Sequence, residues 1–201
     1  DRFQALRPIT RREAYLAERR ARVDAALEQA LRPREGTPPR LHEAMCYAAL
    51  SGGKRVRPIL ALAACEAVPG PPELALPFGC AIEMIHAYSL VHDDLPAMDD
   101  DALRRGRPTV HVAFGEATAI LAGDALLTEA FRVAAEGALR VGLDPARALA
   151  LIATIAGAAG AGGMVGGQAA DLEAEGRVTD LAAVEAIHRR KTAALIAAAV
   201  D

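Results

Sequence analysis

Apolar positions recur with helical spacing along most of the chain, and this pattern is the first indication of its fold class. Over residues 11–32, Leu16, Val23, Leu27 and Ala30 fall on one helical face, whereas arginines and glutamates lie mostly elsewhere. Residues 11–32 are therefore predicted to form an amphipathic helix that buries this face against the rest of the protein.

Proline and glycine mark where the helices begin and end. A linker at 33–39, a helix end at Ser51-Gly52-Gly53 and a firm break at 69–72 divide the first half of the chain. The further predicted helices are 40–50, 57–68, 73–95, 115–140, 145–167 and 180–200. Helix 73–95 is apolar on most sides, which predicts a central position, and Thr179 or Asp180 is expected to cap the last helix. No segment alternates with the period of a strand, so we predict an all-α protein with a single domain over residues 1–201.

Composition and charge exclude several classes of protein. The 201 residues are 52% hydrophobic but only 3% aromatic, which favours tightly packed helices over sheets. The net charge of −3 and the lack of a basic stripe argue against a nucleic-acid binder. No run of about 18 uncharged apolar residues predicts a membrane span.

The cysteines and the chain ends suggest where the protein resides and how much of it is present. Cys46, Cys65 and Cys80 are odd in number and lack a CxxC spacing, so we expect reduced thiols and a cytoplasmic protein. The N-terminus has no signal-peptide core. The chain begins at Asp1 rather than methionine and stops at Asp201 in or just after a helix, which we interpret as part of a longer protein.

The densest chemical signal is the acidic stretch at residues 92–101. Five carboxylates lie within nine residues, interrupted by Leu-Pro-Ala-Met. Two carboxylates about 4 Å apart repel by roughly 4 kcal/mol at an effective dielectric constant near 20, so the fold must supply a counter-charge or raise their pKa values. An all-oxygen ligand set favours a hard cation, and Mg²⁺ commonly bridges carboxylates to substrate phosphates. A solvated acidic loop is the alternative when the stretch is considered alone.

Two basic segments could balance this charge. In the first, Lys54, Arg55 and Arg57 precede a predicted helix start, where free N–H groups and arginine forks favour phosphate. The spacing is not that of a Walker loop, and a solvated basic turn is the alternative. The second segment, 104–107, contains three arginines directly after the acidic stretch. It could neutralise the aspartates or clamp a phosphate, and its spacing does not distinguish these roles.

Two features of the remaining helices bear on the same site. His86 precedes Asp93 by seven residues, which places the two on one helical face about 10 Å apart. Lys191 shares a face with Val184, His188 and Leu195, and would be solvated unless that face lines a cavity.

Six glycines also lie between residues 157 and 167. Together they would cost on the order of 6 kcal/mol in a helix. Close helix packing would offset this cost, and so would a helix that opens beside a ligand.

In order along the chain, these segments resemble the trans-isoprenyl diphosphate synthase family, and within it the bacterial farnesyl type. The matching segments are 52–58, 83–101, 104–109, 114–124 and Lys191-Thr192. The resemblance covers nearly the whole chain from about residue 10. It implies a bundle of helices around a deep cavity, a homodimer, and a Mg²⁺-dependent head-to-tail condensation. The substrates would be isopentenyl diphosphate and dimethylallyl or geranyl diphosphate, and the product farnesyl diphosphate.

The resemblance also implies a role for each matching residue. The expected ligands of Mg²⁺, three ions in a complete enzyme with Mn²⁺ as an alternative, are Asp93, Asp94 and Asp99. Arg104 would contact the allylic diphosphate. The isopentenyl diphosphate site would consist of Lys54, Arg57, His86 and Arg105. The residues beside the allylic diphosphate and its developing cation would be Gln168, Lys191 and Thr192.

Product length is predicted from Tyr88 and Ser89, which precede Asp93 by five and four residues. A bulky residue there stops chain growth in this family, and with the insertion Pro96-Ala97 it resembles the farnesyl type. Geranyl and geranylgeranyl products are the alternatives. An ideal helix separates Tyr88 from Asp93 by about 140°, so helical geometry alone does not place the ring in the cavity.

The chain departs from the family pattern in one respect. The second aspartate-rich motif of the family does not follow Lys191. We interpret this chain as part of a longer protein, with a truncated and inactive protein as the alternative. Intact mass distinguishes the two, because a family-sized chain would have roughly 30 kDa against 21.0 kDa here. A non-catalytic synthase-like subunit is the alternative. A class I terpene cyclase is disfavoured, because it needs no isopentenyl diphosphate site like the cations at 52–58.

Overall fold

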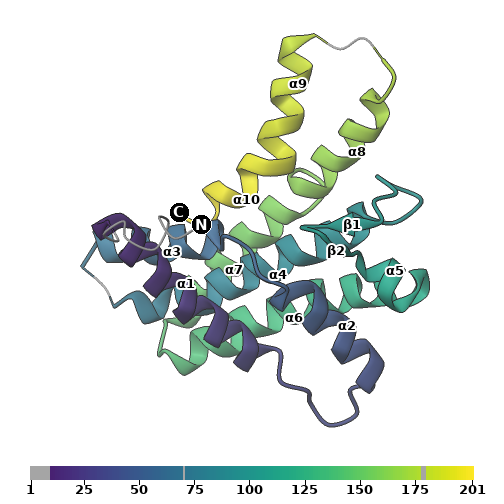
Figure 1. Ribbon diagram of the computed structural model, residues 1–201. Coiled ribbons are helices and arrows are strands. Elements are labelled where there is room, and N and C mark those ends of the chain that lie inside the picture. Colours follow the sequence, from purple (N-terminus) through teal and green to yellow (C-terminus); the bar gives the residue numbers. More distant parts are fainter. Residues whose placement is uncertain (1–9, 70, 178–179) are drawn as a thin grey trace.

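Helices pack around one central helix in the computed structural model, which describes residues 10–69, 71–177 and 180–201 (Figure 1). The first helices are α1 (Arg11–Ala30), α2 (Pro39–Leu50), α3 (Val56–Ala67), the 3₁₀ turn η2 (Pro72–Leu74) and α4 (Leu76–Asp93). They are followed by α5 (Val110–Phe114), α6 (Glu116–Arg140), α7 (Pro145–Ala159) and α8 (Met164–Ala174). The last are α9 (Leu181–His188), the π turn η3 (Arg189–Ala193) and α10 (Ala194–Ala197). This order confirms the all-α prediction.

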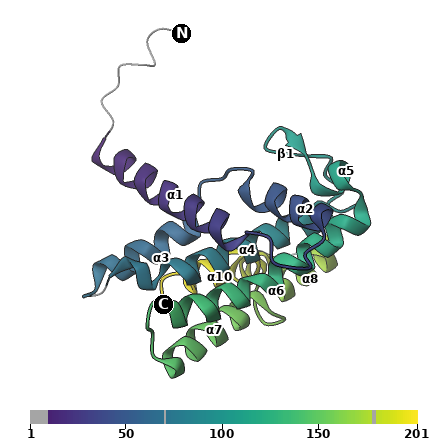
Figure 2. The ribbon, with the colours of Figure 1, turned by 90° about the horizontal axis from the view of Figure 1, so that it is seen from below.

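The central helix is α4, as its apolar sequence predicts. It packs along α6 and also contacts α1, α2 and α3, and two views at right angles place it inside the helix layers (Figures 1 and 2). Ile82, Met84 and Ile85 are all fully buried, so this helix has no solvated face at its centre. Gly123 and Gly137 of α6 let it approach α4 closely, because a Cβ at either would overlap a side chain of α4.

One short β-hairpin was not predicted. Strands β1 (Leu103–Arg104) and β2 (Arg107–Pro108) pair antiparallel, and Arg105 and Gly106 between them both have positive φ. Positive φ at both positions is characteristic of the tight turns that join hairpin strands. Strands of two residues are too short to show a period of two, which explains why the sequence pattern missed them.

The predicted helix 145–167 is wrong, because the chain breaks within the glycine-rich segment. α7 ends at Ala159, and α8 begins at Met164 and continues to Ala174. At Gly163 a Cβ would lie 2.0 Å from the carbonyl oxygen of Ala158, so no larger residue fits this turn without a backbone shift. The glycines therefore allow the helix to open at Gly160–Gly163, while Gly167 packs closely against the backbone at Lys191.

The last predicted helix is confirmed at its start and corrected in its middle. Asp180 caps α9 by accepting a hydrogen bond from the backbone N–H of Ala183 at 2.8 Å, while Thr179 lies outside the described residues. The π turn η3 then interrupts the α-helical pattern before α10. α8 and α9 lie side by side and extend away from the layers around α4 (Figure 1).

Two helical stretches are long and apolar enough to cross a membrane, contrary to the sequence expectation. They are Pro72–Asp93 and Pro145–Ala174, and the second includes the break between α7 and α8. The first is 61% buried, as expected for the core helix of a helical protein, so length and composition carry little weight there. All three cysteines are free thiols, as predicted.

Candidate active site

A cavity of about 370 Å³ lies between α4 on one side and α8 with the π turn η3 on the other. The predicted site residues that line it are Arg57, His86, Tyr88, Ser89, Asp93, Gln168, Lys191 and Thr192. Its apolar lining consists of Leu90, Met98, Met164, Val165, Ala169 and Leu172. Residues far apart in the sequence thus form one pocket with charged groups and an apolar interior.

Helix α4 contributes one wall of this cavity. His86 and Asp93 both line it, as their seven-residue spacing predicts. Tyr88 lines it too and is only 7% exposed, with its ring packed edge-on against His92 at 5.5 Å between ring centroids. The cavity therefore extends far enough around α4 to include a residue that an ideal helix turns away from Asp93.

The acidic stretch folds back on itself at the end of α4. The backbone N–H of Asp99 donates to the carbonyl oxygen of Asp93 at 2.8 Å, so the Leu-Pro-Ala-Met spacer closes a loop. Burial raises the pKa of Asp93 to about 6; Lys191 opposes this rise and Asp99 adds to it. The loop thus brings Asp99 near enough for its charge to act on Asp93.

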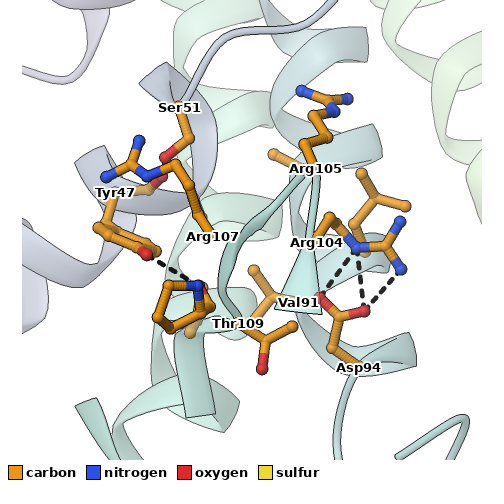
Figure 3. Close-up of a pocket in the computed structure, with 13 residues that line it drawn as sticks. Tyr47, Ser51, Val91, Asp94, Arg104, Arg105, Arg107 and Thr109 are labelled. Atoms are coloured by element: carbon orange, nitrogen blue, oxygen red, sulfur yellow. Dashed lines mark hydrogen bonds and ion pairs between the residues drawn. The ribbon is translucent and has the colours of Figure 1, made fainter. Parts of the chain in front are cut away.

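Asp94 forms an ion pair, although its charge still lies near enough to Asp93 to raise the pKa of that carboxyl. Its carboxylate is buried and accepts hydrogen bonds from Arg104, whose Nε lies 2.9 Å from both oxygens and whose Nη2 lies 2.5 Å from Oδ1 (Figure 3). The pair lines a second, smaller cavity beside Tyr47 and Thr109. Arg104 thus neutralises an aspartate in this structure, and its part in a phosphate clamp stays a prediction.

The carboxylates of Asp93 and Asp99 are oxygen donors of the kind that Mg²⁺ takes. No three His, Cys, Asp or Glu side chains of the described residues converge closely enough to form a complete metal centre. Asp93 and Asp99 nevertheless offer the hard oxygen donors that Mg²⁺ takes when it bridges one or two carboxylates to phosphates. Burial raises the pKa of Asp93 despite the opposing charges of Lys191 and Arg104, and a bound divalent cation would lower it again.

Polar atoms without partners are the clearest sign of a ligand in the cavity. In the described part of the chain, Nε of Arg57 and both polar atoms of the Gln168 side chain are buried without a hydrogen-bond partner. Burial lowers the pKa of the Arg57 guanidinium, and the carboxylate of Glu83 opposes this. An unsatisfied buried polar group costs about 1–3 kcal/mol, so a polar ligand that pairs with these atoms would be stabilised there.

The opposite wall is held by a contact that the sequence did not predict. Nζ of Lys191 donates to Oδ2 of Asp171 at 2.7 Å, so the lysine is both cavity-lining and ion-paired. The only hint in the sequence is that Asp171 follows Gln168 by one helical turn on α8. The backbones of α8 and η3 also approach each other closely at Gly167. A Cβ added to Gly167 would lie 2.3 Å from the backbone nitrogen of Lys191.

Five predicted residues do not line the cavity: Lys54, Asp94, Asp99, Arg104 and Arg105. Lys54 is exposed in the loop before α3 and does not line the cavity. Arg105 lines the second cavity and donates from Nη1 to the carbonyl oxygen of Gly52, and its side chain points away from the Asp94–Arg104 pair (Figure 3). Arg105 therefore ties the hairpin to the loop at residues 51–55, which carries Lys54.

Comparison with known proteins identifies the family. Residues 38–201 match the polyprenyl synthetase family model. The chain is 50% identical to the farnesyl diphosphate synthase of Geobacillus stearothermophilus over 184 residues, which cover 92% of this chain and 61% of that protein. It is 48% identical to a geranylgeranyl diphosphate synthase of Cyanophora paradoxa over 92% of this chain and 61% of that protein.

A solved structure agrees with this assignment. The crystal structure of an FPP/GFPP synthase from Zymomonas mobilis superimposes with a TM-score of 0.88 at 44% identity, covering 94% of this chain and 68% of that chain. This likeness confirms the predicted isoprenoid-synthase bundle. The chain spans about three fifths of the length of the curated relatives it matches. On sequence and fold together, this chain belongs to the polyprenyl synthetase family.

Proposed function

We propose that the protein condenses isopentenyl diphosphate with an allylic diphosphate, head to tail, and releases farnesyl diphosphate and diphosphate. The observation that carries this proposal is the cavity that combines Asp93, the unpartnered polar atoms of Arg57 and Gln168, and an apolar lining. Diphosphates need cations and hydrogen-bond donors, and isoprenoid chains need apolar surface. The names of the relatives support both farnesyl and geranylgeranyl products, so family membership does not decide between them.

The cavity residues and Asp99 would have different roles in this reaction. Asp93 and Asp99 would hold Mg²⁺, which makes diphosphate a better leaving group by taking up its charge. Lys191 would contact the same diphosphate, and Arg57 and His86 would contact the second substrate; all three line the cavity. As the allylic C–O bond breaks, diphosphate keeps the electron pair; the isopentenyl double bond then forms the new C–C bond and loses a proton to diphosphate. The apolar lining keeps water from the allylic cation.

Product analysis of the full-length protein tests this reaction. Dimethylallyl diphosphate and labelled isopentenyl diphosphate are incubated with Mg²⁺, and the product is dephosphorylated and sized by chromatography. We expect a C15 alcohol. No incorporation of label would refute the proposal and favour the non-catalytic subunit, whereas a cyclised hydrocarbon made from the allylic substrate alone would favour a terpene cyclase.

Chain length provides a sharper test, which rests on the size of Tyr88. Replacing Tyr88 with Ala should enlarge the cavity and shift the main product to C20 or longer. Tyr88→Phe should keep the C15 product because the ring remains. Tyr15→Ala on α1 is a matched control, since Tyr15 pairs with Glu66 away from the cavity. An unchanged product from Tyr88→Ala at saturating substrate would overturn the assignment of Tyr88.

Assembly and location remain predictions. We propose a homodimer in the cytoplasm, which follows from the family resemblance and agrees with the three free thiols. Sedimentation equilibrium of the full-length protein checks the homodimer, because a mass of one chain at all concentrations would contradict dimerisation.

A further inference from the structure

Arg55 is charged like its neighbours Lys54 and Arg57, but it points the other way. Its side chain is only 4% exposed, whereas Lys54 is exposed and Arg57 lines the cavity. Nε of Arg55 donates to Asp24 of α1 at 2.7 Å, and Nη1 donates to Glu83 of α4 at 2.9 Å. The guanidinium therefore joins three helices beneath the loop and is not available to a substrate.

The loop above this ion pair needs an anchor, because its backbone is unusual. Gly52, Gly53 and Arg55 have φ angles of 86°, 142° and 51°. A left-handed conformation costs a non-glycine residue roughly 1–2 kcal/mol, so contacts of Arg55 must hold it there. The carbonyl oxygen of Arg55 accepts from the N–H of Ile59 at 3.0 Å and so starts α3. Side chain and backbone of one residue thus fix both the loop and the start of the helix.

Glu83 connects this anchor to the cavity. Its side chain is 6% exposed and sits one helical turn before His86 on α4. A buried carboxylate needs a counter-charge, which Arg55 supplies directly. The same carboxylate acts on Arg57, where it opposes the fall in pKa that burial causes. Arg55 and Glu83 together therefore set the position and electrostatic surroundings of Arg57.

We propose that Arg55 is a positioning residue for the isopentenyl diphosphate side of the site. Through Glu83 and Asp24 it fixes the loop at residues 51–55 and the start of α3, so that Arg57 meets the diphosphate of the second substrate in the cavity. This proposal rests on the proposed condensation reaction. It predicts an effect that is specific to one of the two substrates, because Arg55 and Arg57 lie at the start of α3, whereas Asp93 is ten residues beyond Glu83 on α4 and Lys191 lies in η3.

The decisive variant is Arg55→Lys in the full-length protein. Lysine keeps the charge but has one compact ammonium, which does not span both carboxylates as the guanidinium fork does. We expect KM for isopentenyl diphosphate to rise about tenfold, with KM for the allylic diphosphate and kcat unchanged within about twofold. Asp24→Asn is the milder variant, since Asp24 is 34% exposed, and we expect about a threefold rise in the same KM.

Arg19→Lys is the matched control. Arg19 also joins α1 to α3, through Glu66 at 2.7 Å, but does so away from the cavity. We expect both KM values to be unchanged in this variant. Thermal unfolding of each variant distinguishes loss of fold from loss of positioning, and Asp24→Asn keeps the test decisive should Arg55→Lys not fold.

The possible outcomes separate this inference from the proposed function. A parallel change in both KM values, or no change in either, in a folded Asp24→Asn or Arg55→Lys protein would overturn the positioning role. No condensation by the unsubstituted protein would instead refute the reaction itself.

Discussion

The two walls of the cavity are built in different ways. One wall, the regular wall, is α4, a continuous helix of 18 residues that is buried through its middle and places His86 and Asp93 by regular spacing. The other, the irregular wall, consists of α8 and the π turn η3, two segments next to helix breaks. There, Gln168 and Lys191 are placed by the close backbone contact at Gly167 and by the ion pair with Asp171.

This difference shows two ways in which a helical protein can position a side chain. In a regular helix the spacing of residues fixes the position, and substitutions at neighbouring sites change it little. At a broken helix the position depends on how closely two backbones approach, so one added methyl group can displace it. π turns inside helices occur frequently at functional sites, and η3 presents Lys191 and Thr192 to the cavity.

The largest effect is expected from Gly167→Ala on the irregular wall. The new Cβ would lie 2.3 Å from the backbone nitrogen of Lys191, and backbone atoms cannot turn aside as a side chain does. Overpacking of this kind costs about 3 kcal/mol of unfolding free energy. A displacement of Lys191 by about 1 Å would lower kcat roughly 100-fold. Chemical denaturation and the condensation assay measure the two losses.

Gly157→Ala in α7 is the control for this prediction. A Cβ at Gly157 meets nothing within 4 Å, and alanine is the better helix former, so we expect a gain of about 0.5–1 kcal/mol with unchanged activity. If Gly167→Ala behaves like Gly157→Ala, the irregular wall is not held by close backbone contact, and the comparison of the two walls fails.

A smaller loss is expected at the end of the regular wall, from Asp94→Asn. Removing one partner of a buried ion pair leaves the other charge uncompensated, but the Arg104 side chain is 33% exposed and can be solvated in part. We therefore expect a loss of about 2 kcal/mol in unfolding free energy. Asp101→Asn is the control, since Asp101 is 56% exposed and 3.9 Å from Arg104, and should change stability by less than about 0.5 kcal/mol. Equal losses in both variants would contradict the role given to Asp94.

The sequence predicted the regular wall better than the irregular one, for a physical reason. Periodicity gave α4 its central place and put His86 and Asp93 on one face. The break at Gly160–Gly163 and the π turn at Lys191 depend on contacts between segments that are distant in the sequence. The sequence itself indicates only that several glycines in a helix would be costly.

The acidic stretch shows the same limit. Its need for a counter-charge could be predicted, but not that Arg104 meets it at Asp94 while Asp93 faces the cavity. Spacing along a loop does not determine which way adjacent carboxylates point.

The smallest effect concerns His86, where the regular wall meets the basic segments. Burial, with the positive charges of Arg57 and Arg105 next in importance, lowers its pKa from 6.5 to about 3. The arginines Arg104 and Arg55 act in the same direction. Between these two pKa values the unfolded chain binds a proton at this histidine and the folded protein does not. The free energy of unfolding therefore falls as pH drops below about 6.5, and this contribution levels off below about 3.

The substitution His86→Gln removes this proton uptake and so tests how closely the α4 wall is packed around residue 86. Between pH 7 and pH 5 the unsubstituted protein should lose about 1–2 kcal/mol more in unfolding free energy than the variant, because only its unfolded state gains a proton there. Denaturant titrations at the two pH values measure the difference, and carboxylates common to both proteins cancel. Parallel pH profiles would mean that His86 is solvated in the folded protein. The basic side of the cavity would then not be packed as closely as the burial of Arg57 and Arg55 requires.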